Sequence, residues 1–354
     1  MRGWKEARRS YWQHRLSRFL QHATPKRLAN LMQVHAEYRL GVSRVSSLPP
    51  LVHIDPLNFC NLHCPVCPTG RGTLGRHRGR MPMDLFRALV DEISDRVFFL
   101  NLYNWGEPLL HPQIFDMVEY ATSRGLSVRI SSNLNVMTSE QARLMVESGL
   151  EELLVDLDGA TQETYEIYRV GGSLARVVEN IREITHAKNR LKTPFPLITA
   201  RVLVTKHNYH ELSQIRALAW SLGVDRFVVS PIHVNLSRSN DIDLWAVQEN
   251  VESTDPPRKP RKCDQLWFNL TISWDGGVFP CCWFHEQEYD FGNIYYGERR
   301  LTMIWNNDRF VQSRKFVTGK TLHLPGTICG RCKGYPQYLS LIHISEPTRL
   351  LSIS

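Results

Sequence analysis

Three cysteines fall within eight positions of this 354-residue sequence, in the stretch CNLHCPVCP. Cys60, Cys64 and Cys67 are separated by three and then by two residues. A disulfide uses two sulfurs and a structural zinc site normally uses four ligands, so three clustered thiols favour a metal centre with one open position. Three thiolates can hold three corners of a cubane [4Fe–4S] cluster and leave the fourth iron free. The trio therefore predicts an iron–sulfur centre that binds a substrate or cofactor at this iron.

The cysteine trio follows the first of six β-rich runs that alternate with helical patterns. The predicted strands are 52–57, 97–103, 127–131, 152–157, 197–205 and 225–230, and the predicted helices are 84–94, 113–124, 139–148, 174–188 and 209–222. This alternation predicts a parallel sheet covered by helices. Six strands are too few for a closed eight-stranded barrel, so we expect an α/β partial (β/α)6 TIM-like barrel. Its chemistry belongs at the C-terminal ends of the strands.

Local signals mark the ends of several predicted helices. Gly125, Gly149 and Gly223 each follow a helical pattern, where a left-handed C-cap is expected, and Thr138 with Gln141 fits a capping box. These residues set the helix boundaries, and therefore the lengths of the loops between helices and strands.

The cysteine motif and two later motifs resemble those of one enzyme family. The spacing Cys60-x3-Cys64-x2-Cys67, after the first strand, resembles the signature of the radical S-adenosylmethionine (radical SAM) superfamily. The stretch NWGEPLLHP (104–112) is similar to the GGEP motif of that family, and DLDGATQETYEIYR (156–169) to its S-x-D-G stretch with a downstream Tyr-Arg. The resemblance covers roughly residues 50–335. It implies a SAM-binding [4Fe–4S] cluster and S-adenosyl-L-methionine (SAM) as cofactors.

The resemblance assigns SAM-binding roles to residues at successive strand ends. Gly106 and Glu107 of the GGEP-like motif are implied to hold the SAM amino group. Ser131 and Asn133 end the third strand, where the family hydrogen-bonds ribose or carboxylate, and Arg169 is implied to meet the SAM carboxylate. Each of these residues alone could be an ordinary loop or surface residue. Their shared placement at strand ends is what indicates a site.

Two positions depart from the family pattern. Asp156, assigned to the same SAM site, replaces the usual Ser, and Val66 replaces the frequent aromatic residue before the last cysteine of the trio.

A second group of cysteines lies around a predicted hairpin, with strands at 267–273 and 278–279. The segments CDQLWFNLTISWDGGVFPCC, FGNI and CGRC resemble the SPASM or shorter twitch extension of the superfamily. The four thiolates suffice for one auxiliary [4Fe–4S] cluster, although thiolate spacing alone leaves a structural zinc site open. The expected ligands of this cluster are Cys263, Cys281, Cys329 and Cys332.

Two further residues refine this auxiliary site. Tyr338 stands where the full SPASM pattern has another cysteine, which favours one auxiliary cluster over two. Cys282 is expected on the opposite face of a strand from Cys281, as a spare or buried thiol and not a ligand.

The net charge of +8 is concentrated at the N-terminus, because residues 1–50 hold ten Lys and Arg against Glu6 and Glu37. Apolar residues recur there at helical spacing opposite a basic face. We prefer the interpretation that this helix packs on its own domain and exposes its basic face to solvent. The alternative is that it docks on a partner or on an anionic membrane. The residues of this pattern are Trp4, Arg8, Tyr11, Trp12, Leu16, Phe19 and Leu20.

Composition divides the chain into five expected parts: a basic N-terminal helical segment (1–50), the partial barrel (51–235), a polar linker (236–262), the auxiliary cluster domain (263–338) and a non-native tail (339–354). The tail is set aside because LSLIHISEPTR resembles a translated sequencing adapter. No apolar run is long enough for a membrane span, and no signal-peptide run follows the basic N-terminus. Clustered thiols that bind metal indicate a cytoplasmic protein.

These features predict a radical SAM oxidoreductase or maturase. It would cleave SAM reductively to a 5′-deoxyadenosyl radical and abstract hydrogen from its substrate, which we expect to be a peptide side chain or a small alcohol, sugar or amine. The resemblance implies a low-potential electron donor of the flavodoxin or ferredoxin type. The auxiliary cluster would accept the substrate electron or bind the substrate. The twitch-like extension resembles that of 2-deoxy-scyllo-inosamine dehydrogenase, which slightly favours a small alcohol.

A different class of protein stays open at this point. A zinc-stabilised nucleic-acid-binding protein could use the basic N-terminal arm for phosphate contacts. The charge-balanced body and the trio of cysteines disfavour this alternative, so no nucleic-acid partner is expected.

Overall fold

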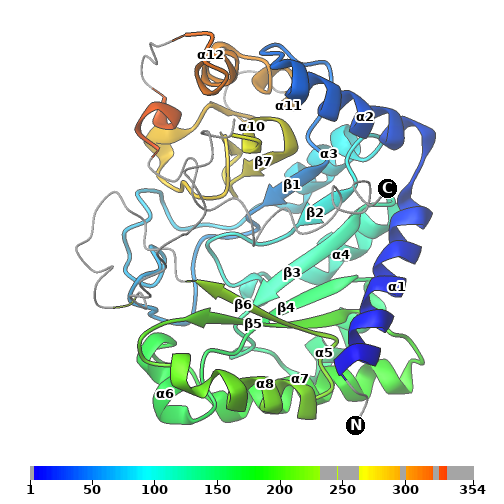
Figure 1. Cartoon of the computed structure of the whole chain (residues 1–354), viewed down its shortest axis with the longest axis vertical. Helices are drawn as coiled ribbons and strands as arrows, with labels where there is room; N and C mark the ends of the chain where they lie inside the picture. Colours follow the sequence, from blue (N-terminus) through cyan, green and yellow to red (C-terminus); the bar gives the residue numbers. More distant parts are fainter. Residues whose placement is uncertain (1–3, 232–244, 246–262, 296–299, 322–326, 333–354) are drawn as a thin grey trace, which may run out of the picture.

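The computed structural model describes residues 4–231, 245, 263–295, 300–321 and 327–332. The predicted linker (236–262) lies outside the described residues except for Trp245, and the predicted tail (339–354) lies outside them entirely. The strands form one nine-stranded sheet in the order β6-β5-β4-β3-β2-β1-β7-β8-β9, with helices packed around it (Figure 1). Among the described residues, no helix is both long and apolar enough to cross a membrane.

The first six strands pair in parallel in their sequence order. Because the sheet does not close on itself, the predicted partial barrel of parallel strands is confirmed. Strands buried on both faces tolerate continuous apolar runs, as in the LLV stretch (153–155) of β4. The strands are β1 (Leu51–Ile54), β2 (Phe99–Asn101), β3 (Ser127–Ser132), β4 (Glu152–Asp156), β5 (Leu197–Val204) and β6 (Arg226–Pro231).

The connecting helices begin and end within three residues of the predicted boundaries. They are α3 (Met83–Ile93), α4 (Ile114–Ser123), α5 (Ser139–Glu147), α7 (Leu174–Arg190) and α8 (Leu212–Ser221). The short helices η1 (Pro108–Leu110), α6 (Gln162–Tyr168) and η2 (Tyr209–Glu211) lie in loops after β2, β4 and β5. The capping box of Thr138 and Gln141 is present, and Gly125, Gly149 and Gly223 all have the left-handed φ expected of them.

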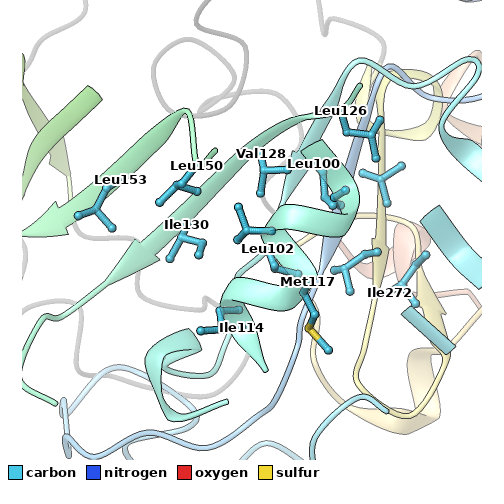
Figure 2. Close-up of a cluster of buried hydrophobic side chains, with 14 of the residues drawn as sticks. Leu100, Leu102, Ile114, Met117, Leu126, Val128, Ile130, Leu150, Leu153 and Ile272 are labelled. Atoms are coloured by element: carbon cyan, nitrogen blue, oxygen red, sulfur yellow. The ribbon is translucent and has the colours of Figure 1, made fainter. Parts of the chain in front are cut away.

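The core lies between the sheet and its covering helices. Figure 2 shows Ile114 and Met117 of α4 beside Leu100, Val128 and other strand side chains of β2 and β3. All four of these side chains are at most 1% exposed. Fully burying each such side chain stabilises the fold by about 1.5–3 kcal/mol, so this layer holds the strand ends in fixed positions.

The C-terminal hairpin extends the barrel sheet, which the sequence did not indicate. Strand β7 (Asn269–Ile272) pairs in parallel with β1 along its whole length, and β8 (Gly277–Phe279) and β9 (Gly292–Asn293) follow in antiparallel pairing. Around them lie α10 (Gln265–Phe268), η3 (Gln287–Tyr289), α11 (Leu301–Ile304), α12 (Asp308–Val317) and η4 (Ile328–Arg331). The strands next to the two groups of cysteines therefore belong to one sheet.

Two N-terminal helices, α1 (Trp4–His22) and α2 (Pro25–Leu40), run along one edge of the molecule (Figure 1). On the inner side of α1, the Tyr11 hydroxyl donates to Glu152 at 2.9 Å, and the Phe19 ring stacks on Phe98 with ring centroids 5.0 Å apart. The preferred interpretation of this segment, packing on its own domain, therefore holds for these side chains.

Glu152 is the centre of a buried ionic cluster at the N-terminal end of the barrel. Its carboxylate accepts hydrogen bonds from Arg129 at 2.6 Å and from Thr199 at 2.8 Å. Burial alone would raise the pKa of Glu152, but Arg129 and Arg15 outweigh it and lower the pKa to about 2. The ionised form is therefore part of the folded state.

Replacing Glu152 by Gln should lower the free energy of unfolding at pH 7 by about 3 kcal/mol, because Arg129 loses its buried partner. The advantage of the wild type should shrink as pH falls from 4.5, the usual pKa of a glutamate, toward 2, because the unfolded chain takes up a proton there before the folded chain does. Denaturant unfolding of both proteins at pH 7 and pH 3 measures this change. The exposed Glu140→Gln variant is the control, and a stability gap that is equal at both pH values would contradict the assignment.

Candidate metal and cofactor centre

The C-terminal strand ends surround a single cavity of about 300 Å3. The three cysteines of the trio line this cavity, and so do all six residues that the sequence assigned to SAM binding: Gly106, Glu107, Ser131, Asn133, Asp156 and Arg169. These residues come from loops or strand ends after β1, β2, β3 and β4 and from the end of α6. The structure thus brings the whole predicted set together.

The cysteine loop is held by backbone hydrogen bonds; Cys64 is buried, and Cys60 and Cys67 are half-buried. The Cys67 N–H donates to the Cys64 carbonyl at 3.2 Å, and the His63 N–H donates to the Val170 carbonyl at 3.0 Å. Burial raises the pKa of the Cys60 thiol to about 12 and that of Cys64 to about 11. Buried thiols of this kind become thiolates when a metal centre supplies the compensating positive charge.

Neighbouring N–H groups point at the cysteine sulfurs. The Leu62 backbone N–H lies 3.4 Å from the Cys60 sulfur, and the Asn133 amide nitrogen lies 3.5 Å from it. The Arg169 guanidinium lies 3.9 Å from the Cys64 sulfur. Hydrogen bonds to cluster sulfurs raise reduction potentials, so these contacts fit thiolates that serve as cluster ligands.

The GGEP-like loop is positioned by Asp55, a residue that the sequence analysis missed. Asp55 follows β1 directly and accepts hydrogen bonds from the backbone N–H groups of Trp105 at 3.2 Å and Gly106 at 3.4 Å. A side chain at Gly106 would place its Cβ 2.1 Å from the Leu57 carbonyl oxygen. Only glycine fits at position 106, because this loop lies directly against the chain that leads to the cysteines.

Glu107 is a buried residue in the wall of the cavity. Its carboxylate accepts hydrogen bonds from the Ser132 hydroxyl at 2.8 Å and from the backbone N–H groups of Asn133 at 2.9 Å and Leu109 at 3.1 Å. Burial nevertheless raises the pKa of Glu107 to about 7. A cationic amino group in the cavity would favour the ionised form of this carboxylate.

Arg169 lies in a buried network of four charges. Its guanidinium contacts Asp158 at 2.5 Å and Asp156 at 3.0 Å, and the Arg201 guanidinium contacts Asp156 at 2.7 Å. Arg201 also donates to the Ser131 hydroxyl at 3.2 Å. Asp156 replaces the Ser of the family pattern, and Arg201 supplies the countercharge that this replacement needs.

Several cavity residues were not foreseen from the sequence. Ser230 ends β6 as the predicted residues end their strands, so its position was the signal that could have found it. The Ser230 hydroxyl and the Asn104 side-chain nitrogen are buried and form no hydrogen bond with any described residue. The unforeseen polar and aromatic lining residues are His53, Tyr103, Asn104, Trp105, Tyr168, Arg201, Ser230 and Trp283.

Unlike Cys281, Cys282 also lines the cavity, although it does not lie in the expected strand. It follows the end of β8 in a turn, where strand alternation no longer determines the direction of a side chain. Burial raises the pKa of Cys282 to about 12, so it is a neutral thiol at pH 7.

The auxiliary cysteines lie near one another, with Cys263, Cys281 and Cys329 half-buried and Cys332 exposed. Burial is the main cause of the raised pKa of Cys263, and the neighbouring Cys329 and Cys332 thiols raise it further. Burial likewise raises the pKa of Cys281, with added contributions from Cys329 and Cys263. Among the residues that the structure describes, no three His, Cys, Asp or Glu side chains are grouped as ligands of a metal ion. A donor set made only of thiols is nevertheless the set that iron–sulfur clusters use, so these residues fit the group.

The open parallel barrel, with a cysteine trio beside polar strand ends, is the architecture of an iron–sulfur enzyme of the α/β class. A family model described as "Radical SAM superfamily" matches residues 54–219, and one described as "Iron-sulfur cluster-binding domain" (SPASM) matches residues 263–333. The chain therefore belongs to the radical SAM superfamily and carries a SPASM domain. As an enzyme of this class it uses a SAM-binding [4Fe–4S] cluster, SAM and further iron–sulfur chemistry in the SPASM domain.

Curated relatives include a protein from Pyrococcus furiosus named tungsten-containing aldehyde ferredoxin oxidoreductase cofactor-modifying protein. It is 27% identical over 313 residues, which cover 78% of this chain and 86% of the relative. Mycofactocin maturase MftC of Mycobacterium ulcerans is 30% identical over 161 residues, 45% of this chain and 41% of MftC. The chain thus spans most of the first relative and less than half of the second. The nucleic-acid-binding alternative receives no support from these comparisons.

Solved structures share the fold at low sequence identity. SuiB of Streptococcus suis bound to S-adenosylmethionine superposes with a TM-score of 0.61 and 14% identity, over 82% of this chain and 72% of SuiB. BtrN in complex with AdoMet and 2-DOIA gives a TM-score of 0.50 and 19% identity, over 81% of this chain and 94% of BtrN. These similarities establish the fold.

Iron analysis of anaerobically purified protein should give about eight irons per chain, because two cubane clusters hold four irons each. Replacing Cys60, Cys64 or Cys67 by Ala should leave about four irons, and so should Cys281→Ala. The neighbouring Cys282→Ala variant is the matched control and should keep the wild-type iron content. Loss of iron in the Cys282 variant but not in the Cys281 variant would reverse the two assignments.

Proposed function

We propose that this chain cleaves SAM reductively and abstracts a hydrogen atom from an organic substrate. When bound, the cluster and SAM supply a 5′-deoxyadenosyl radical, and the chain supplies the cavity that binds and orients both partners. The main support for this proposal is that three thiols and six strand-end residues of the family pattern line one cavity. Nine residues from four separate motifs between positions 60 and 169 converge there.

Each wall of the cavity has its own proposed role. Glu107 accepts a hydrogen bond from the SAM amino group, and Arg169 attracts the SAM carboxylate. Asn133 donates a hydrogen bond to SAM or to the Cys60 sulfur. Asp156 and Asp158 hold the Arg169 guanidinium beside Cys64 and restrict its rotation. A fixed donor of this kind loses less entropy when an anionic ligand binds.

Aromatic side chains meet where the cavity borders the SPASM domain. The Trp105 indole N–H donates to the Phe284 carbonyl at 3.4 Å, and the Trp105 ring meets the His285 ring edge-on, with centroids 5.1 Å apart. We propose that this contact excludes water from the reacting atoms, which protects a radical from unwanted quenching.

The first candidate substrate is a peptide side chain. This choice is supported by relatives named as maturases, and by the fold shared with SuiB, which was also solved bound to precursor peptide SuiA. A low-potential donor of the flavodoxin or ferredoxin type would deliver the electron for SAM cleavage. Reduced thiols as cluster ligands fit a cytoplasmic location.

A small alcohol, sugar or amine is the second candidate. Three further polar residues that line the cavity favour it, because Asn104, Ser230 and Arg201 suit a compact substrate with several oxygen atoms. The auxiliary cluster would accept an electron from such a substrate or bind it directly.

The reduced holoenzyme should convert SAM to 5′-deoxyadenosine and methionine, detected by chromatography. Cys64→Ala should abolish the product, because the SAM-binding cluster loses a ligand. Glu107→Gln should weaken SAM binding by about tenfold or more, because a charged hydrogen bond is lost. The exposed Glu140→Gln variant should match the wild type. The proposal fails if the iron-loaded wild type yields no 5′-deoxyadenosine.

Deuterium transfer distinguishes the two substrate classes. A deuterated peptide or a deuterated polyol is incubated with the reduced enzyme, and the true substrate class should place deuterium in 5′-deoxyadenosine. Arg201→Met and Ser230→Ala should each reduce the transfer by about tenfold, because each removes a polar side chain that lines the cavity and is proposed to bind the substrate. Transfer from neither class would reject both candidates while leaving SAM cleavage intact.

A further inference from the structure

The outer sides of α1 and α2 form a surface that the enzyme chemistry does not use. On the inner side of α2, the rings of His35 and Tyr38 pack edge-on against Phe268 of α10, at centroid distances of 4.9 and 5.4 Å. On α1, Tyr11 and Phe19 fill the inner side. Both helices lie along one edge of the molecule (Figure 1). The inner sides of α1 and α2 therefore pack against the rest of the protein, and the outer sides take no part in these contacts.

The outer sides expose large apolar side chains at helical spacing. On α2, Leu28, Met32 and Leu40 are 38%, 69% and 75% exposed and lie four and then eight residues apart. On α1, Leu16 and Leu20 are 43% and 63% exposed. These five are nearly half of the twelve large apolar side chains that are exposed in the described part of the chain. Such residues scattered singly need no explanation, but five on two consecutive helices make a stripe.

Within residues 9–46 the exposed charged side chains all have one sign, and one of them, Lys26, lies 3.5 Å from the exposed carboxylate of Asp95. Arg9, Lys26, Arg39 and Arg44 are exposed, and within residues 9–46 no carboxylate is exposed. Glu37 is the acid of that stretch, and it is buried, where it accepts a hydrogen bond from the Ser46 N–H at 2.7 Å. We call the five apolar residues with these four cations the α1–α2 face.

We propose that the α1–α2 face docks the enzyme on an anionic phospholipid surface. Apolar tips flanked by Arg and Lys are the features with which surface helices bind the boundary between headgroups and acyl chains. A lipid layer demands matching charge and exposed apolar side chains but no complementary shape, which suits the outside of two helices. Four cations near an anionic leaflet contribute measurably to binding, and salt weakens their contribution. This inference stands independently of the proposed reaction.

The test is sedimentation of the full-length, anaerobically purified holoenzyme with lipid vesicles. Vesicles of phosphatidylcholine with about one third phosphatidylserine should bind the wild type, and vesicles of phosphatidylcholine alone should bind it at least about tenfold more weakly. Met32→Ser with Leu40→Ser should weaken binding about tenfold or more. Arg39→Gln with Arg44→Gln should weaken it about 25-fold, because each charge contributes about fivefold.

Matched variants on other elements separate this face from general stickiness. Ile167→Ser with Tyr209→Ser removes two other exposed apolar side chains, 42% and 53% exposed, from α6 and η2. Arg182→Gln with Arg216→Gln makes the same change in net charge on α7 and α8. Both control pairs should bind vesicles like the wild type. Unchanged iron content and circular dichroism in every variant exclude misfolding as the cause.

Three outcomes would overturn the proposal. The wild type could fail to bind the anionic vesicles, or the control pairs could weaken binding as much as the α1–α2 pairs do. The Met32 and Leu40 changes could instead shift the oligomeric state in sedimentation velocity while vesicle binding stays constant. That last result would make the face a contact between copies of this chain.

Discussion

Strand β1 is hydrogen-bonded on both edges, to β2 on one side and to β7 on the other. Its C-terminal end leads directly into the cysteine loop and, through Asp55, holds the backbone of Trp105 and Gly106. The SAM-binding strands therefore fan out from one edge of β1, and the SPASM domain grows from the other. The position of every group in the cavity depends on the register of this one strand.

Charge compensation is the second constraint on the site. Arg169, Asp156 and Asp158 are buried beside the cysteine trio with the half-buried Arg201, and removal of any one would leave an uncompensated charge in a low-dielectric interior. Burial would raise the pKa of Asp156, but Arg169 and Arg201 outweigh it and lower the pKa. The pKa of Asp158 is raised by burial and by the neighbouring Asp156. The network keeps Arg169 charged and fixed beside a cluster ligand. Catalytic preorganisation and local folding thus use the same contacts.

The parallel barrel and the main site could be predicted because both leave strong local patterns. Alternating apolar runs and capping signals such as Thr138 fix the strands and helices, and motif residues at strand ends fix the site. The pairing of β7 with β1 could not be predicted, because two strands more than 200 positions apart carry no local mark of their register. Arg201 was missed because it lies in the middle of β5 and belongs to no motif, whereas the position of Ser230 near the end of β6 was a signal that could have found it.

The place of β7 in the sheet also bears on how the protein is made. During synthesis on a ribosome, β1 emerges early, but the strand that covers its second edge comes more than 200 residues later. Until then β1 offers unsatisfied backbone groups to other chains, the usual starting point of aggregation. Stable insertion of the first iron–sulfur cofactor should therefore wait until β7 has been synthesised and has paired with β1.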